Sequence, residues 1–287
     1  MPMDRVQVVE VGPRDGLQAE PQPYSTAQKV ELIERLMDAG LRRIEATSFV
    51  SPSVVPQLGD AAEVLAAVSR RTDVEISALV PNRRGLERAI MARVDRVAVF
   101  TSATETFAER NIRCSIDESF ARFEPVVQGS IAAGVPVRGY VSMAWHCPYE
   151  GAVSPTDTLV VARRLISLGC DEISLADTVG RATPREVESL VRLVSTEIPV
   201  SRLAVHLHDT AGRALANVEA ALVGGVRVFD AAIAGLGGCP FAPGSPGNLG
   251  TEVLVERLHA LGFETGVSIE ALGAAAALAR PAARRAA

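Results

Sequence analysis

The chain has 287 residues, of which 48% are hydrophobic and only 4% aromatic, and its formal net charge is −5. This length accommodates one large α/β barrel or two small domains, and the acidic balance argues against a nucleic-acid partner. No apolar stretch approaches the roughly 20 residues of a transmembrane helix, so no membrane association is expected. The four cysteines are widely spaced and form no CxxC pair, which argues against a zinc ribbon or disulfide scaffold and predicts a cytoplasmic protein.

Short runs rich in Val and Ile alternate with longer helical patterns. In chain order, these runs predict eight strands over about 6–11, 43–49, 75–80, 96–101, 137–143, 172–177, 203–208 and 228–234. Amphipathic spacing predicts helices over 26–39, 117–133, 156–168, 184–197 and 214–223. Ser25 and Thr183-Pro184 are expected helix starts. Left-handed glycines are expected just after helix ends at Gly40, Gly134, Gly169 and Gly224.

Eight β–α units without a linker predict an α/β fold, a (β/α)8 TIM barrel with a C-terminal helical extension. We expect a single catalytic domain over 1–287, with the barrel at about 5–262 and a helix and frayed tail at about 263–287. The alternative is a doubly wound open sheet, which usually has fewer strands. It is disfavoured because no GxGxxG motif follows the first strand.

Active sites of this barrel lie at the C-terminal ends of its strands. In this sequence, polar residues that could bind a ligand or take part in catalysis lie at or just after those strand ends. They are Arg14, Asp15, Glu45, Thr47, Ser48, Asn82, His146, Asp177, Thr178, His206, His208 and Asp209.

His206 and His208 are two of only four histidines, and they flank Leu207 at the end of a predicted strand. Side chains alternate along a strand, so both imidazoles share one face. Asp15 follows the first strand, a close neighbour of the seventh in a closed barrel, and Asn248 adds a carbonyl oxygen. Two nitrogens and two oxygens without a thiolate suit Mg²⁺, Mn²⁺ or Co²⁺. Purely structural roles would be a hydrogen-bonded histidine pair, a turn at Asp15 and a helix cap at Asn248.

Two further residues have types suited to acyl chemistry. Arg14 precedes Asp15, so its guanidinium can stabilise an oxyanion near the cation. A salt bridge with Glu45 or Asp177 is the structural alternative, and the two roles need not exclude each other. Cys239 lies in the glycine- and proline-rich segment 235–248, which can act as a lid and carry the thiol in as a proton donor. The alternative for Cys239 is an inert small apolar residue.

Several longer segments, taken together, resemble the hydroxymethylglutaryl-CoA lyase family of metal-dependent barrels. The most specific are VEVGPRDGLQAE (9–20), AVHLHDTAGRALAN (204–217) and AGLGGCPFAPGSPGNLGTE (234–252), and the resemblance extends to about residue 270. HxHDT alone is shared with related condensing synthases, whereas its pairing with RDGLQ and GLGGCP is highly specific.

The resemblance implies cleavage of 3-hydroxy-3-methylglutaryl-CoA to acetyl-CoA and acetoacetate, in leucine degradation and ketone-body metabolism, by a homodimer. It implies that Mg²⁺ or Mn²⁺ is bound by Asp15, His206, His208 and Asn248. It also implies a catalytic Cys239, enolate stabilisation by Arg14 and support of the metal-bound water or substrate by Glu45. Ser174 and Asp177 match positions that line the family's pocket.

Trp145-His146 departs from the family's pattern before CPYEG (147–151), where smaller residues are expected. A bulky Trp145 would reshape the acyl pocket toward a related hydroxyacyl-CoA such as citramalyl-CoA. A condensing synthase of the same barrel group and a non-enzymatic binding barrel are also compatible with the fold. A synthase would normally carry extra regulatory or lid domains after the barrel.

Overall fold

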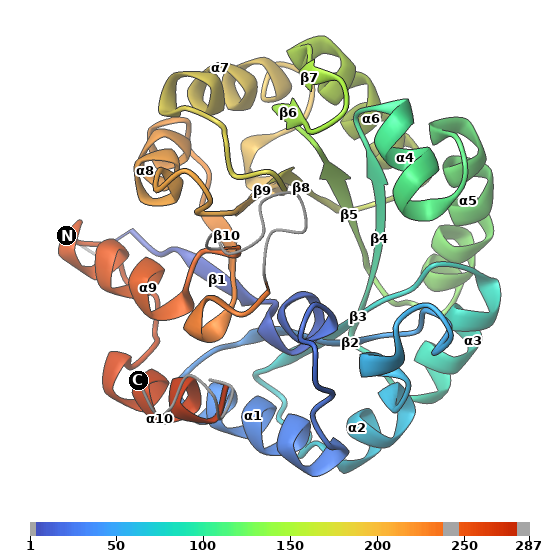
Figure 1. Ribbon diagram of the computed structural model, residues 1–287, viewed down its shortest axis with the longest axis vertical. Helices are drawn as coiled ribbons and strands as arrows, with labels where there is room; N and C mark the ends of the chain where they lie inside the picture. The colour runs from blue at the N-terminus through green and yellow to red at the C-terminus, as the bar shows by residue number, and fades with distance from the viewer. Residues whose placement is uncertain (1–3, 238–246, 280–287) are drawn as a thin grey trace.

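The computed structural model describes residues 4–237 and 247–279. Eight parallel strands close into a barrel in the order β1-β10-β9-β8-β5-β4-β3-β2, with the helices arranged around them (Figure 1). The predicted TIM barrel is therefore confirmed. The barrel strands are β1 (Gln7–Glu10), β2 (Arg43–Ser48), β3 (Glu75–Leu79), β4 (Arg96–Ser102), β5 (Val137–Ser142), β8 (Glu172–Asp177), β9 (Leu203–Leu207) and β10 (Val228–Ala231).

All eight predicted strands are present, each with its ends within three residues of the prediction. The helices are α1 (Thr26–Asp38), α2 (Ala61–Ala67), α3 (Arg83–Met91), α4 (Glu105–Ile112), α5 (Ile116–Ala132), α6 (Pro155–Leu168), α7 (Pro184–Val194), α8 (Ala214–Val223), α9 (Thr251–Ala260) and α10 (Ile269–Ala279). Among them, α2, α3, α4 and α9 have no counterpart among the predicted helix ranges. No helix in the described parts of the chain combines the length and hydropathy needed to cross a bilayer.

Local sequence signals explain where the helices begin. Ser25 and Thr183 each form a capping box with the residue three positions later, and Pro184 occupies the first turn of α7. Gly40, Gly134 and Gly169 have positive φ as predicted. The prediction for Gly224 is wrong, because its φ is −70° and the next residue, Gly225, adopts the positive φ of 91°.

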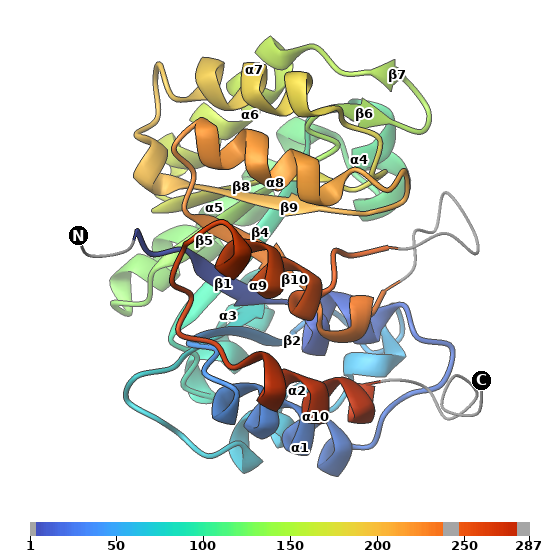
Figure 2. The same cartoon turned by 90° about the vertical axis from the view of Figure 1, so that its left-hand side faces the viewer.

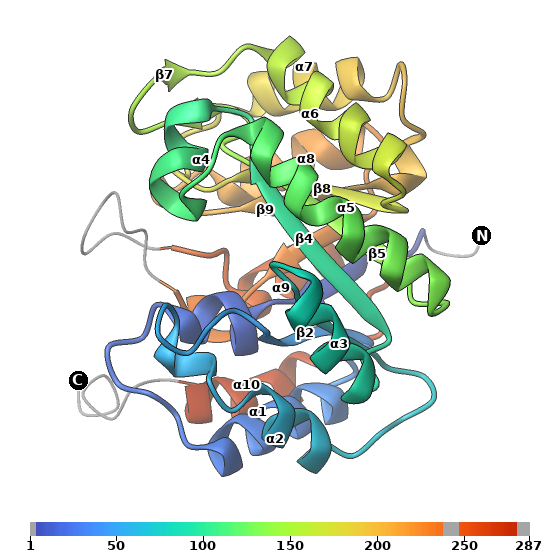
Figure 3. The same cartoon turned by 90° about the vertical axis from the view of Figure 1, so that its right-hand side faces the viewer.

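The barrel carries two additions, a hairpin at one end and a helix on its outer side. The short strands β6 (His146–Cys147) and β7 (Gly151–Ala152) form an antiparallel hairpin, which lies with α4 at the end toward which the barrel strands point (Figures 2 and 3). Helix α10 packs beside α1, and the Tyr24 hydroxyl donates a 2.8 Å hydrogen bond to the carbonyl oxygen of Ala279 at its end. The hairpin thus stands at the mouth where the candidate site lies.

Ion pairs occupy part of the barrel interior. Arg43 makes two hydrogen bonds to Glu172, at 2.9 and 3.0 Å, and Glu172 also pairs with Arg138 at 2.9 Å. Arg138 in turn donates to Asp230 at 2.6 Å. These side chains are almost fully buried, so each charge requires an opposite charge to offset its desolvation. This series of ion pairs extends from the base of the barrel toward its mouth.

Candidate active site

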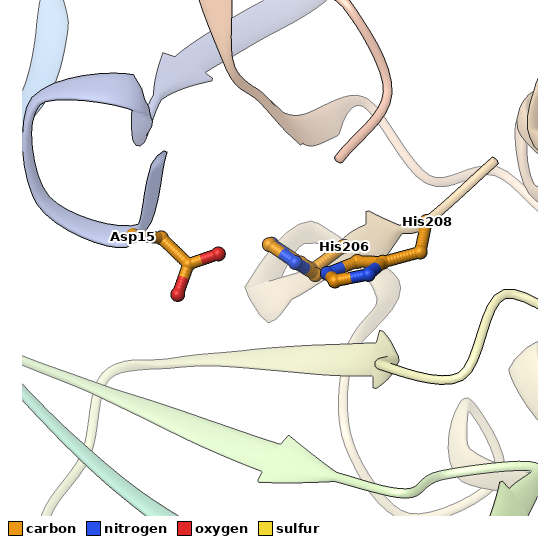
Figure 4. A group of neighbouring side chains, drawn as sticks. All are labelled: Asp15, His206 and His208. Carbon is orange, nitrogen blue, oxygen red and sulfur yellow. The ribbon is translucent and has the colours of Figure 1, made fainter. Parts of the chain in front are cut away.

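Asp15, His206 and His208 converge at the C-terminal end of the barrel strands. Each offers one ligand atom, and the three atoms lie within 4.8 Å of one another (Figure 4). Asp15 is held in a short π-helical turn, η1 (Gly12–Gly16), directly after β1, whereas His206 lies in β9 and His208 just beyond its end. The imidazole centroids are 5.3 Å apart. The two predicted imidazoles therefore share one face and meet the predicted carboxylate.

Asn248 joins this cluster through its side chain. Its Nδ2 donates to Asp15 Oδ2 at 2.9 Å and to the Leu236 carbonyl oxygen at 3.0 Å. Its Oδ1 is buried and has no hydrogen-bond partner among the described residues. Asn248 does not cap a helix, because Gly250 precedes α9 and no side chain caps it.

The donor set fits a hard divalent cation. Asn248 Oδ1 and the Nδ1 atoms of His206 and His208 are buried without a hydrogen bond within the described chain. Buried polar atoms normally have a hydrogen-bond partner. An unpaired amide oxygen beside Asp15 is therefore consistent with a site in which this oxygen binds a cation. One carboxylate, two imidazoles and an amide oxygen are ligands that Mg²⁺ and Mn²⁺ accept.

Electrostatics hold these groups in the protonation states that bind cations. Burial alone would raise the pKa of Asp15, but Arg14 and the two imidazoles outweigh it and hold that pKa at about 2. Burial, together with His206, lowers the pKa of His208 to about 3. At neutral pH Asp15 is thus ionised and His208 is neutral.

Arg14 lies between two carboxylates. Its Nε donates to Glu45 Oε1, and its Nη1 donates to Asp15 Oδ1 at 2.6 Å. Burial disfavours the charged guanidinium, but Glu45 and Asp15 outweigh this and raise the pKa of Arg14. The expected salt bridge with Glu45 is present. Asp177 instead accepts hydrogen bonds from three backbone N–H groups of the loop that follows it, residues 180–182.

A buried polar network beneath Arg14 was not predicted from the sequence. The Tyr140 hydroxyl donates to Glu45 Oε2 at 2.6 Å, and Arg138 donates to Tyr140 at 3.2 Å. Arg138 and Asp230 interrupt the apolar runs of β5 and β10. A charged residue inside a buried strand is the signal that could have identified both. This network couples the Arg14 side of the mouth to the base of the barrel.

The remaining predicted residues have different surroundings. The Ser174 hydroxyl donates to Asp230 Oδ2 at 2.9 Å, below the histidines. The indole N–H of Trp145 donates to the Glu186 carbonyl oxygen at 3.2 Å, so its described polar contact is with α7. Cys239 lies outside the described residues.

Comparison with known proteins decides the family. The HMGL-like family model matches residues 5–279. The chain belongs to the hydroxymethylglutaryl-CoA lyase family. It is 53% identical over 270 residues to hydroxymethylglutaryl-CoA lyase of Pseudomonas mevalonii, covering 94% of this chain and 90% of that protein.

Solved structures of the family agree with this assignment. The HMG-CoA lyase of Brucella melitensis is 50% identical and superposes with a TM-score of 0.94, covering 96% of this chain and 97% of that one. An HMG-CoA lyase of Acinetobacter baumannii, in complex with coenzyme A and 3-methylmalate, is 39% identical with a TM-score of 0.91, and the match covers 96% and 92% of the two chains. The likeness therefore spans the barrel and not only its motifs.

Proposed function

We propose that the protein cleaves 3-hydroxy-3-methylglutaryl-CoA to acetyl-CoA and acetoacetate. The observation that carries this proposal is the convergence of Asp15, His206 and His208 beside the Arg14 guanidinium. The family's relatives named as hydroxymethylglutaryl-CoA lyases support it over nearly the full chain. Both the cation-binding groups and a fixed positive side chain are present for a reaction that develops negative charge.

The proposed cofactor is Mg²⁺ or Mn²⁺, held by Asp15, His206, His208 and Asn248. Bound there, the cation would supply positive charge that lowers the pKa of the substrate's tertiary hydroxyl. The orphaned Oδ1 of Asn248 supports its inclusion with the three groups that converge.

The chain's own residues would then carry the proton and the charge. Asp15, or a base beside it, takes the hydroxyl proton, and the electron pair of the breaking C–C bond forms the acetyl-CoA enolate as acetoacetate is released. Arg14 stabilises the enolate oxygen. Glu45 fixes the guanidinium by accepting a hydrogen bond from Arg14 Nε. Cys239 is proposed to protonate the enolate carbon, which gives acetyl-CoA.

The direct test is to incubate purified protein with Mg²⁺ and 3-hydroxy-3-methylglutaryl-CoA and to measure acetoacetate. We expect turnover that chelation by EDTA abolishes and that added Mg²⁺ or Mn²⁺ restores. A folded, cation-loaded protein that releases no acetoacetate would contradict the named substrate. The Asp15→Ala variant, which lacks one cation-binding group, is expected to lose both turnover and Mn²⁺ binding.

A related hydroxyacyl-CoA is the second candidate substrate. The relative bound to coenzyme A and 3-methylmalate shows that a smaller hydroxy diacid occupies a structure of this family. A panel that compares kcat/KM for 3-hydroxy-3-methylglutaryl-CoA with that for citramalyl-CoA would separate the two. We expect the larger value for the former.

We also propose a cytoplasmic homodimer acting in leucine degradation and ketone-body formation. The three described cysteines, Cys114, Cys147 and Cys170, are free thiols, which supports a reducing compartment. Light scattering of the purified protein tests the dimer: a mass near twice the chain's 30.3 kDa is expected, and a mass near 30.3 kDa contradicts it.

A further inference from the structure

Asp230 and His206 lie side by side on neighbouring strands. They are direct partners in the parallel register of β10 and β9, so their side chains leave the barrel wall at the same level. His206 Nδ1 lies 3.4 Å from Asp230 Oδ2. Asp230 is buried and is not one of the three residues whose ligand atoms converge, so it stands beside that group rather than within it.

Both oxygens of Asp230 are fixed from below. Arg138 donates to Oδ1 at 2.6 Å, and the Ser174 hydroxyl donates to Oδ2 at 2.9 Å. These two hydrogen bonds, one to each oxygen, restrain rotation of the carboxylate and leave Oδ2 3.4 Å from His206 Nδ1.

We propose that Asp230 is a positioning residue that holds His206 in the tautomer with its proton on Nδ1. An imidazole binds a cation through one nitrogen, and the other nitrogen needs an acceptor that fixes the ring and its tautomer. With Nδ1–H directed at Asp230, the lone pair of Nε2 faces the cation site. The inference rests on the cation site of the proposed function.

The two histidines differ in this respect. Nδ1 of both histidines is buried and makes no hydrogen bond among the described residues, but only His206 Nδ1 has a carboxylate oxygen within 4.0 Å, that of Asp230 at 3.4 Å. His206 is thus the oriented member of the pair, and Asp230, Ser174 and Arg138 form the support that orients it.

The first experiment reads the tautomer in the wild-type protein. Long-range ¹H–¹⁵N NMR spectra distinguish protonated from unprotonated ring nitrogens, and only four histidines need assignment. We expect His206 to carry its proton on Nδ1 at neutral pH. A proton on Nε2 would overturn the proposal whatever any variant does.

The second experiment measures binding of Mn²⁺ alone by EPR of the free ion. Asp230→Asn preserves the size of the side chain and is expected to raise the Kd for Mn²⁺ about 10- to 100-fold. Glu172→Gln is the matched control, because it removes a carboxylate from the same Arg138 without touching His206. We expect its Kd to stay within about twofold of wild type.

The outcomes distinguish loss of the positioning role of Asp230 from loss of the cation site itself. Mn²⁺ binding by the wild type and an unchanged Kd for Asp230→Asn would overturn the positioning role and leave the cation site standing. Equal losses in Asp230→Asn and Glu172→Gln would also overturn it, since both would then act through Arg138. If the wild type fails to bind Mn²⁺, the cation site and this inference both fall. If Asp230→Asn does not fold, the wild-type tautomer decides.

Discussion

A 2.6 Å hydrogen bond from the Thr251 hydroxyl to Glu10 Oε2 joins the last barrel helix to the first strand. The other oxygen of Glu10 accepts from the backbone N–H groups of Gly12 and Ile233, at 2.8 and 2.9 Å. Gly12 begins the turn that carries Asp15. One buried carboxylate therefore fastens three chain segments at the mouth of the barrel.

Replacing Glu10 by Gln should change how stability depends on pH. Burial raises the pKa of Glu10 from 4.5 to about 7. Between these values the folded protein keeps a proton that the unfolded chain releases, so the free energy of unfolding falls as pH rises, by about 3 kcal/mol in total. The amide oxygen of glutamine can accept from both N–H groups and its NH2 can donate to the Thr251 oxygen, so three hydrogen bonds remain, one of them reversed, and the side chain does not titrate. We expect Glu10→Gln to match wild type near pH 4.5 and to exceed it at pH 8.

Urea unfolding at both pH values measures this difference. Glu63→Gln, which changes an exposed glutamate on α2, is the control and should parallel wild type throughout. If wild type and Glu10→Gln depended on pH in the same way, folding would not raise the pKa of Glu10.

Much of the fold was predictable because each barrel strand is a short apolar run bounded by helical patterns. The missed helices have weaker signals. Helix α2 has only seven residues, and α3 contains three arginines within nine. Strand ends were less predictable: His208 fits the strand pattern, but it leaves β9 to form an isolated bridge with Asn248, a residue 40 positions away.

The site was predictable only in part, for a related reason. The spacing of His206 and His208 on one strand placed them together, and barrel closure brought Asp15 to them. The contact between Arg138 and Asp230 joins residues 92 positions apart. It depends on the registers of β5, β8, β9 and β10 across the closed barrel, which hydrophobic periodicity does not specify.

Arg14→Lys tests whether a planar guanidinium is needed. Lysine keeps one charge but cannot engage Glu45 and Asp15 with fixed, divergent donors. We expect kcat to fall about 10²- to 10³-fold, as for loss of an oxyanion donor, while Mn²⁺ still binds, because the substitution removes no cation ligand and keeps the positive charge. An unchanged kcat would exclude enolate stabilisation by this guanidinium.

Arg14→Met tests how much the positive charge of Arg14 contributes to stability, apart from its role in catalysis. It leaves the Glu45 carboxylate buried without its cationic partner, which should lower the free energy of unfolding by about 3–5 kcal/mol. Arg14→Lys should lose clearly less, as measured by urea denaturation. Equal losses in the two variants would mean that charge at this position does not stabilise Glu45.

Substitutions of a cation ligand and of the proposed proton donor should have different effects on Mn²⁺ binding. His208→Ala removes one of the three converging ligand atoms, so Mn²⁺ affinity and turnover should both fall sharply. Cys239→Ala should retain Mn²⁺ binding and lose most turnover, because it removes a proton donor and no cation ligand. EPR titration and an acetoacetate assay on both variants measure this. Equal loss of Mn²⁺ affinity in the two would contradict the division.

Trp145→Phe should leave the choice of acyl chain unchanged. Trp145 is nearly buried, and its indole N–H donates to the Glu186 carbonyl oxygen, while His146 Nε2 lies 3.1 Å from Glu186 Oε1. These contacts fasten the β6–β7 hairpin to the start of α7. Loss of one such hydrogen bond should cost about 1 kcal/mol of stability.

The measurement is the ratio of kcat/KM for 3-hydroxy-3-methylglutaryl-CoA to that for citramalyl-CoA. For Trp145→Phe we expect a ratio within about twofold of wild type, because a single neutral hydrogen bond outside the site is lost. Tyr140→Phe is the contrast: it also removes one buried aromatic hydrogen-bond donor, but this donor binds Glu45 inside the barrel, so kcat should fall. A tenfold change of this ratio in Trp145→Phe would mean that the indole contacts the acyl chain. That result would contradict the expectation drawn from its contacts with α7.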